Sequence, residues 1–144
     1  MGPRPTLRPS KNMGPVQNTG VALKGYESLL KGPLSKAAVG LIGEALVIKY
    51  LESQDLKLKS HRLRVSRFSE VDLVFTQDQH EVWVEVKTTQ SRKFHFFPWS
   101  QKQQEALNRS LEVYSQKNTQ TQYQVCLALV SCKQIQFIDQ SYLS

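Results

Sequence analysis

The stretch EVDLVFTQDQHEVWVEVKTT, residues 70–89, decides the fold. Two parts of it, 70–76 and 81–89, alternate apolar with polar side chains, as a β-strand with one buried face does. The four polar residues between them, 77–80, predict a short turn, so the two strands are expected to form a β-hairpin.

The alternation also predicts where the charged side chains of this hairpin point. Successive side chains of a strand lie on opposite faces, so one apolar set is expected in a common core: Val71, Leu73, Phe75, Val82, Val84 and Val86. Asp72, Glu85 and Lys87 would then meet on the other face. Two carboxylates on adjacent strands repel each other unless a cation lies between them, and oxygen ligands favour Mg²⁺ or Mn²⁺. The ordinary alternative is a solvated strand face.

A helix is predicted before the hairpin, over about 35–54, with Ser35 as its N-cap. Positions 41, 44, 48 and 51 form one stripe of this helix, so Glu44 is expected among apolar neighbours. A carboxylate there needs a metal or a basic partner, and a simple salt bridge to a Lys or Arg is the alternative.

Two glycines, Gly40 and Gly43, precede Glu44 in the same helix. Glycine within a helix costs about 1 kcal/mol relative to alanine. We therefore expect this turn of the helix to pack closely against the sheet.

The remaining pattern completes an α/β domain. It predicts a strand over 56–66, a second helix over about 100–117, a buried strand over 122–131 and a short edge strand over 134–138. The spacing of Ser100 and Gln103 is that of a capping box. The order is α-β-β-β-α-β with a final strand, which indicates a mixed sheet flanked by helices.

The first 35 residues differ in composition, because they hold five of the six prolines and five basic side chains against one acidic side chain. We expect a basic extension over 1–34, disordered over 1–20 with a short helix within 21–31, and a domain over 35–144. Its basic groups would grip phosphates non-specifically or form an inert extension, and the sequence leaves both open.

The whole chain of 144 residues carries a formal charge of +7, which favours a polyanionic partner such as nucleic acid over a charge kept for solubility. The two cysteines, Cys126 and Cys132, do not form a zinc motif, and their context suggests a reducing compartment. We find no membrane-spanning apolar run and no signal segment, so we expect a cytoplasmic protein.

Four segments together resemble a known superfamily: Gly43-Glu44 on a helix, EVDLVF at 70–75, VWVEVKT at 82–88 and SQKQQEAL at 100–107. Their order and spacing resemble the PD-(D/E)XK nucleases, in particular the small bacterial YraN-like family, and are similar to archaeal-type Holliday junction resolvases. The resemblance covers about residues 36–138. It implies a restriction-endonuclease-like core that hydrolyses DNA phosphodiester bonds, with branched or junction DNA as a candidate substrate.

The resemblance also implies roles for particular residues. Asp72 and Glu85 would bind Mg²⁺ or Mn²⁺ together with the backbone carbonyl of Val86. Lys87 would orient or activate the attacking water, and Glu44 would lie near the metal, directly or through water. Thr88 and Thr89 stand where YraN-like proteins usually have a basic residue, and the long basic extension is also a departure.

Six basic side chains are candidate phosphate contacts: Arg62, Arg64, Arg67, Arg92, Lys93 and Lys102. Lys102 is chosen by the resemblance, and solvated surface charge is the alternative for each of them. The aromatic segment 94–99 is expected to cap a small core, and stacking on unpaired bases is its alternative.

Two other functions stay open beside a deoxyribonuclease of branched or duplex DNA. The chain would act as a non-catalytic DNA-binding or scaffolding module if its site had no turnover, and charge alone does not exclude an RNA substrate. Junction resolvases of the superfamily suggest a homodimer by analogy.

Overall fold

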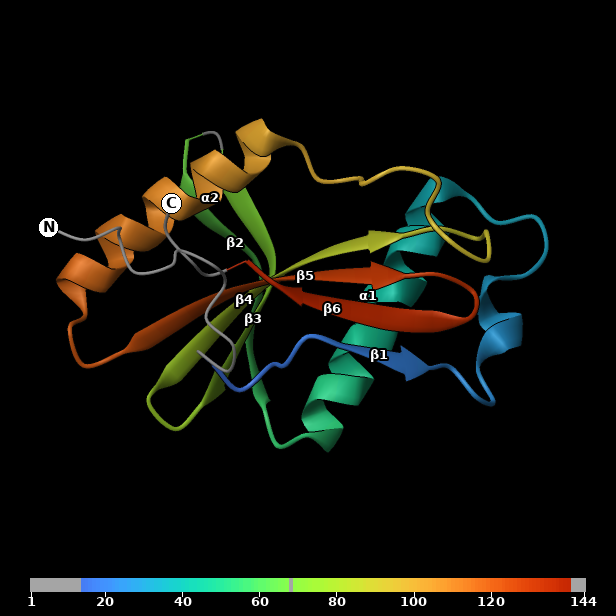
Figure 1. Cartoon of the computed structure of the whole chain (residues 1–144), viewed down its shortest axis with the longest axis horizontal. Helices are drawn as coiled ribbons and strands as arrows, with labels where there is room; N and C mark the ends of the chain where they lie inside the picture. The colour runs from blue at the N-terminus through green and yellow to red at the C-terminus, as the bar shows by residue number, and fades with distance from the viewer. Residues whose placement is uncertain (1–13, 68, 141–144) are drawn as a thin grey trace, which may run out of the picture.

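The structure is a computed structural model that describes residues 14–67 and 69–140. Its elements along the chain are β1 (Thr19–Ala22), η1 (Glu27–Leu30), α1 (Lys36–Ser53), β2 (Lys57–Ser66), β3 (Ser69–Gln77), β4 (His80–Thr88), α2 (Gln101–Lys117), β5 (Gln122–Val130) and β6 (Gln134–Asp139). The strands form one sheet in the order β1-β6-β5-β4-β3-β2 (Figure 1). The β4–β5 pair is parallel and the other neighbours are antiparallel. The α/β class and the mixed sheet are confirmed.

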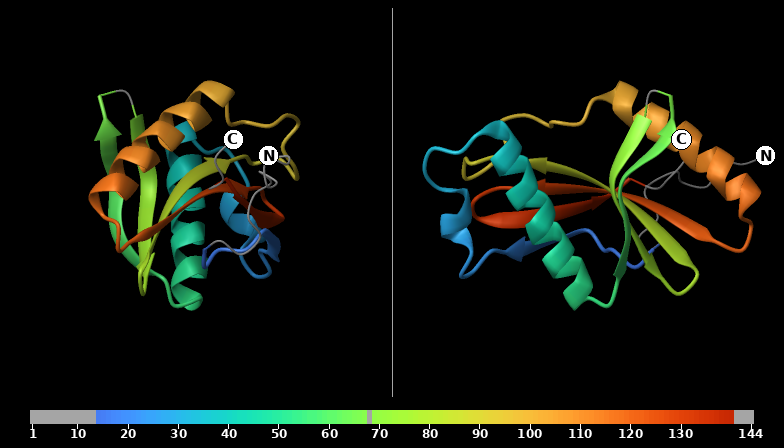
Figure 2. Two further views of the ribbon diagram at one scale, coloured as in Figure 1. Left: turned by 60° about the vertical axis from the view of Figure 1, so that its left-hand side comes forward. Right: turned by 180° about the vertical axis from the view of Figure 1, so that it is seen from behind.

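The two long helices cover opposite faces of the twisted sheet, as the views of Figure 2 show. α1 packs Leu46, Val47 and Leu51 onto an apolar cluster that includes Leu73 and Val84. α2 buries its predicted stripe, Leu107 and Leu111 with Tyr114 partly buried, against a second cluster around Trp83. The sheet that carries Asp72, Glu85 and Lys87 therefore has an apolar layer on each side.

The hairpin has the predicted turn, but the face of one residue, Val71, was predicted wrongly. Leu73, Phe75, Val82 and Val84 are buried on the α1 side with Val86 packed beside them, whereas Val71 lies in the α2-side cluster. The alternation breaks because the β3–β4 ladder begins only at Leu73↔Val84, and the Asp72 carboxylate accepts the Val86 N–H instead.

α1 begins as predicted, with the Ser35 hydroxyl accepting a hydrogen bond from the Ala38 N–H at 3.1 Å. A Cβ on Gly43 would collide with the Thr88 side chain of β4, which confirms the expected close packing at that glycine. At Gly40, no described atom beyond its chain neighbours and the adjacent backbone of α1 lies within 4 Å of such a Cβ, so the expectation is wrong there. The predicted stripe is also wrong at Leu41, which is 59% exposed, because the helix meets the sheet through Gly43, Val47 and Leu51.

The extension was expected to be disordered to residue 20, and the structure contradicts this for residues 14–20. Val16 is buried, and its backbone exchanges two hydrogen bonds with the buried Gln124 side chain, at 3.1 and 2.7 Å. Strand β1 pairs antiparallel with β6, so β6 is not the edge strand that was predicted. The expectation for residues 1–13 falls outside the described residues.

Other local predictions agree with the structure. The segment 21–31 contains the short 3₁₀-helix η1, and its Leu30 is buried. Ser100 and Gln103 form the capping box of α2. Among the described helices, none combines the length and apolar character needed to cross a lipid bilayer.

Candidate functional site

Asp72 of β3 is the centre of the candidate site, and it lies just beyond the end of the regular β3–β4 pairing. The β2–β3 register places Arg62 opposite Asp72, and the β3–β4 register places Glu85 opposite it, yet neither pair belongs to the ladders of the described strands. Arg62 has a positive φ of 52°, a conformation that departs from extended backbone. The Asp72 Oδ2 atom turns to the Val86 backbone and accepts its N–H at 2.8 Å. The end of the β3–β4 ladder lets the Asp72 carboxylate reach β4, the strand that carries Glu85 and Lys87.

Glu85 is the most perturbed carboxyl group of the site. Its side chain is 11% exposed, and its Oε2 atom lies 3.4 Å from Lys87 Nζ. Its Oε1 atom is buried and has no hydrogen-bond partner among the described residues. Burial, followed by repulsion from Asp72, raises the pKa of Glu85 to about 8, and the attraction of Lys87 opposes this shift. A buried carboxyl oxygen normally has a hydrogen-bond partner, an ordered water or an ion beside it, so this oxygen is an acceptor that a bound group could use.

Glu44 approaches the same centre from α1. Its side chain is 15% exposed, and its Oε1 atom lies 3.8 Å from an Arg62 nitrogen. Burial and the negative charge of Asp72 raise the pKa of Glu44, while Arg62 and His61 lower it. Glu44 therefore has the basic partner that the salt-bridge alternative predicted, namely Arg62. Its carboxyl group also interacts electrostatically with Asp72.

The four predicted catalytic residues are linked through Asp72 and Glu85. Asp72 acts on Glu44 and on Glu85, and Lys87 contacts Glu85. The backbone of Val86 is fixed by its bond to Asp72 and by its pairing with Ala128 of β5. Two strands and one helix position the set, which three separate sequence segments predicted.

A divalent cation fits part of this donor set. Among the described residues, no group of three or more His, Cys, Asp and Glu side chains is arranged as a metal cage. Mg²⁺ usually keeps several waters and takes only one or two protein carboxylates together with substrate phosphate. Asp72, Glu85 and a carbonyl are consistent with that demand, and the unpartnered Glu85 oxygen is the observation in its favour.

A small pocket of about 90 Å³ adjoins Glu85 on the α2 side. Trp99, Gln103 and Leu107 line it together with Glu85, and the Trp99 indole nitrogen is also buried without a partner among the described residues. Two residues that line this small space, Glu85 and Trp99, therefore each have a buried polar atom without a partner among the described residues.

The predicted phosphate contacts are exposed, but not all of their charges are free. Arg62 lies near Glu44, and Arg64 lies 3.7 Å from Glu70 while donating to the Arg67 carbonyl at 3.2 Å. Exposed side chains complete the set: Arg67, Arg92, Lys93 and Lys102. Of these, Arg92 and Lys93 line a larger groove of about 420 Å³.

The aromatic segment divides into two pairs. Phe94 and Trp99 pack on the α2-side core, as expected. Phe96 is 77% exposed and Phe97 is 51% exposed, so capping of a core does not describe them. Packing thus holds for the two outer aromatics of the segment and fails for the two inner ones.

Sequence reasoning missed two supporting residues. Thr88, noted only as a departure from the resemblance, fills the space left by Gly43. Trp99 lines the pocket beside Glu85. Gly43 indicated that α1 approaches another element closely, but only the fold shows that Thr88 of β4 is the residue it faces.

The fold and site define a class: a mixed α/β protein whose sheet holds Asp72, Glu85 and Lys87 where the β3–β4 ladder ends, with Glu44 of α1 beside Asp72. The chain belongs to the uncharacterised protein family UPF0102, whose family model matches residues 43–135 and so includes all four residues. A UPF0102 protein of Syntrophomonas wolfei subsp. wolfei (strain DSM 2245B / Goettingen) is 39% identical over 56 residues. That alignment covers 39% of this chain and 48% of the relative, so the chain spans about half the length of the curated relative it matches.

Proposed function

We propose that this protein is a divalent-metal-dependent nuclease of the PD-(D/E)XK type that hydrolyses DNA phosphodiester bonds. The observation that carries the proposal is the buried Glu85 carboxyl group, which interacts with Asp72 and Lys87 and has one oxygen without a hydrogen-bond partner among the described residues. Membership of UPF0102 accords with the YraN-like resemblance of the sequence.

The electrostatics favour a cation at this place. Burial and repulsion from Asp72 raise the pKa of both Glu44 and Glu85, so the metal-free cluster is unfavourable when fully ionised. Among the described residues, Lys87 contacts Glu85 and Arg62 lies near Glu44, so two basic side chains face three carboxyl groups. A divalent ion would offset the negative charge that remains when all three carboxyl groups are ionised. In this proposal Asp72, Glu85 and the Val86 carbonyl hold Mg²⁺ or Mn²⁺, with Glu44 bound directly or through water.

The residues of the chain supply the rest of the chemistry. The metal ion would contribute Lewis-acid polarisation of the scissile phosphate. Lys87 places a positive charge beside Glu85, where it orients the attacking water and stabilises negative charge that develops on the phosphate oxygens. The sheet holds both residues on one strand, so their spacing is fixed before substrate binds.

We also propose the nucleic-acid partner, the cellular location and the oligomeric state. The +7 charge and exposed basic groups suit DNA, branched or duplex, in the cytoplasm. A homodimer is proposed by analogy with junction resolvases, because a symmetric junction presents two equivalent strands. RNA as substrate, and a DNA-binding module without turnover, are the competing functions.

Cleavage of a panel of labelled nucleic acids tests the proposal. Branched, single-stranded and duplex DNA, with RNA in parallel, are incubated with and without Mn²⁺. We expect Mn²⁺-dependent cleavage of DNA and a loss of at least about 100-fold in Glu85→Gln. Glu112→Gln is the matched control, since it makes the same chemical change at an exposed position of α2.

Two outcomes would contradict the proposal. Binding of DNA without cleavage under every condition would favour the non-catalytic module. Metal-dependent cleavage at the wild-type rate by Glu85→Gln would show that Glu85 is not part of the active site. Preferential cleavage of RNA would replace the proposed substrate.

A further inference from the structure

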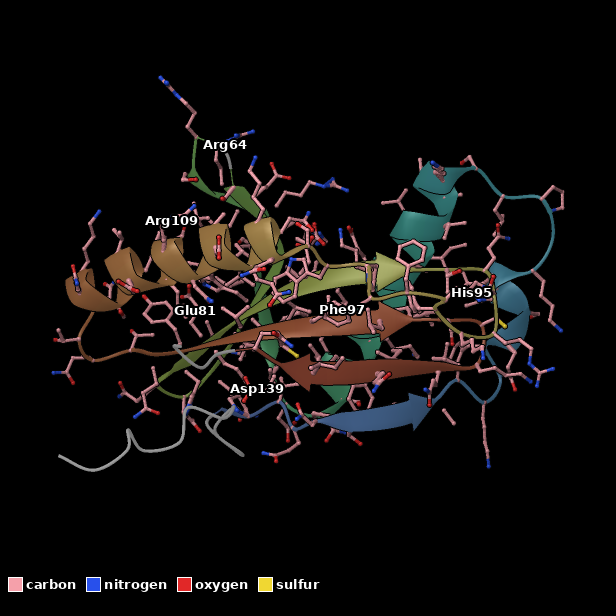
Figure 3. All side chains as sticks on the ribbon, turned by 45° about the horizontal axis from the view of Figure 1, so that its top comes forward. Arg64, Glu81, His95, Phe97, Arg109 and Asp139 are labelled. Carbon is pink, nitrogen blue, oxygen red and sulfur yellow. The ribbon has the colours of Figure 1, made fainter. Side chains whose placement is uncertain are left out.

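The loop between β4 and α2 forms one wall of the groove of about 420 Å³. Figure 3 shows His95 and Phe97 on this loop. Basic Arg92 and Lys93 lie at its start, and the amide side chains of Gln134 and Gln136 on β6 contribute to the groove. The groove thus combines positive charge, aromatic rings and polar side chains.

The loop holds two phenyl rings in solvent. Phe94 and Trp99 anchor it, since both pack on the α2-side core. Phe96 and Phe97 between them are 77% and 51% exposed. Adjacent exposed aromatics supported by buried ones form an apolar surface that a partner would cover.

The register of the sheet connects this groove to the proposed active site. Lys87 of β4 pairs with Leu129 of β5, and Leu129 pairs with Gln136 of β6. Paired residues of neighbouring strands point to the same face, and neighbouring strands lie about 4.8 Å apart. Leu129 and Gln136 both line the groove, so the groove begins one strand away from Lys87 on the same face of the sheet.

We propose that this groove binds unpaired nucleotides of the DNA substrate, with bases stacked on Phe96 and Phe97. Arg92 and Lys93 provide the positive charge that backbone phosphates require, and Gln134 and Gln136 offer donors and acceptors to base edges. The inference rests on the proposed function for the choice of DNA. It adds that the enzyme prefers DNA with single-stranded character, because the faces of paired bases are already covered in a duplex stack.

Binding measured without divalent metal tests this inference separately from cleavage. Fluorescence anisotropy compares a labelled oligothymidine with a duplex of equal length. We expect the double variant Phe96→Ala/Phe97→Ala to lose roughly 10- to 100-fold in affinity for the single strand and less than about twofold for the duplex, because base stacking supplies only the former. Both rings are exposed, so the variant should fold normally, which circular dichroism checks.

Tyr26→Ala is the matched control, because Tyr26 is also an exposed ring beside a basic group. It is 38% exposed, and Lys49 Nζ lies 5.7 Å from its ring centroid, but it lines a different pocket near α1 and β1. We expect this variant to bind both DNAs like the wild type. The variant Phe96→Leu/Phe97→Leu, which keeps apolar side chains but removes aromatic faces, should show most of the loss.

Three results would overturn the inference. They are unchanged single-strand affinity in the double variant, an equal loss for single strand and duplex, and tighter binding of oligouridine than of oligothymidine. Failure of the proposed function gives a different result, namely wild-type single-strand binding that depends on Phe96 and Phe97 together with no cleavage of any DNA. Glu85→Gln should bind the single strand as the wild type does.

Discussion

The carboxylate of Asp72 accepts a hydrogen bond from the backbone N–H of Val86 at 2.8 Å, at the point where the regular pairing of β3 and β4 ends. A side chain therefore takes the place of a ladder bond between two central strands. The same local change turns Val71 to the α2-side core. Asp72 consequently has a structural role beside its proposed role as a metal ligand.

This double role predicts different effects for two substitutions. Asp72→Ala leaves the half-buried Val86 N–H without its acceptor, so we expect a loss of about 1–3 kcal/mol in the free energy of unfolding. Asp72→Asn keeps an oxygen acceptor, so it should lose cleavage with a smaller loss of stability. Urea denaturation of both variants measures this. Equal stability of Asp72→Ala and the wild type would contradict a structural role for the bond.

The two glycines of α1 should respond in opposite ways to alanine. A Cβ at Gly43 would meet the Thr88 side chain, so we expect Gly43→Ala to destabilise the fold by about 1–3 kcal/mol. Gly40 has open space for a Cβ among the described residues, so Gly40→Ala should stabilise the helix by up to about 1 kcal/mol. Thermal and urea denaturation of the pair decide this. A stabilised Gly43→Ala variant would show that α1 and β4 do not approach closely.

The raised pKa of Glu85 predicts that the stability of the metal-free protein depends on pH. Its pKa rises from an ordinary 4.5 to about 8, so between these values the folded state holds a proton that the unfolded state has released. The associated stability is fully present below about pH 4.5 and is lost as pH rises to about 8, with a slope of at most about 1.4 kcal/mol per pH unit.

Unfolding in EDTA across this range measures the slope. We expect Glu85→Gln to flatten it and Glu112→Gln to leave it unchanged. An identical slope in Glu85→Gln and the wild type would mean that another group holds the proton.

The contacts of Glu81 allow a prediction of how much a buried hydrogen bond away from the proposed active site contributes to the free energy of unfolding. Its carboxylate lies 2.6 Å from Lys59 Nζ and accepts the hydrogen bond of the buried Trp83 indole at 2.9 Å. Glu81→Ala removes both contacts, and we expect a loss of about 1–3 kcal/mol because the indole donor is left unpaired. Glu81→Gln keeps an acceptor for Trp83 and loses only the pair with the 56% exposed Lys59, so it should cost under about 1 kcal/mol. Equal losses in the two variants would refute this division.

The fold could be predicted from sequence wherever a segment had a clear period and end signals. The hairpin of β3 and β4 and the capped helix α2 are such segments. Strand β1 was missed because it has only four residues, and proline and glycine dominate its surroundings. Its pairing with β6, like the contact of Val16 with Gln124 of β5, joins residues far apart in the sequence, which no local pattern reveals.

The acidic residues of the candidate site could be predicted from the sequence, but the way their strands are paired could not. Asp72 was found because it interrupts an apolar run, and Glu85 because alternation places it on one strand face with Lys87. Glu44 was found because it lies on a helix amid apolar residues. The face of Val71 was predicted wrongly because strict alternation assumes an unbroken ladder, and the Asp72–Val86 bond interrupts it. The exposure of Phe96 and Phe97 was missed because apolar composition by itself favours burial.

The most direct test of the proposed metal site is anomalous scattering from crystals of the full chain soaked in Mn²⁺. We predict one strong peak in contact with the carboxylates of Asp72 and Glu85 and with the carbonyl of Val86, at about 2.2 Å, and no such peak in Glu85→Gln crystals. A saturating soak that left this position empty, or that placed Mn²⁺ only at other surface carboxylates, would contradict the account.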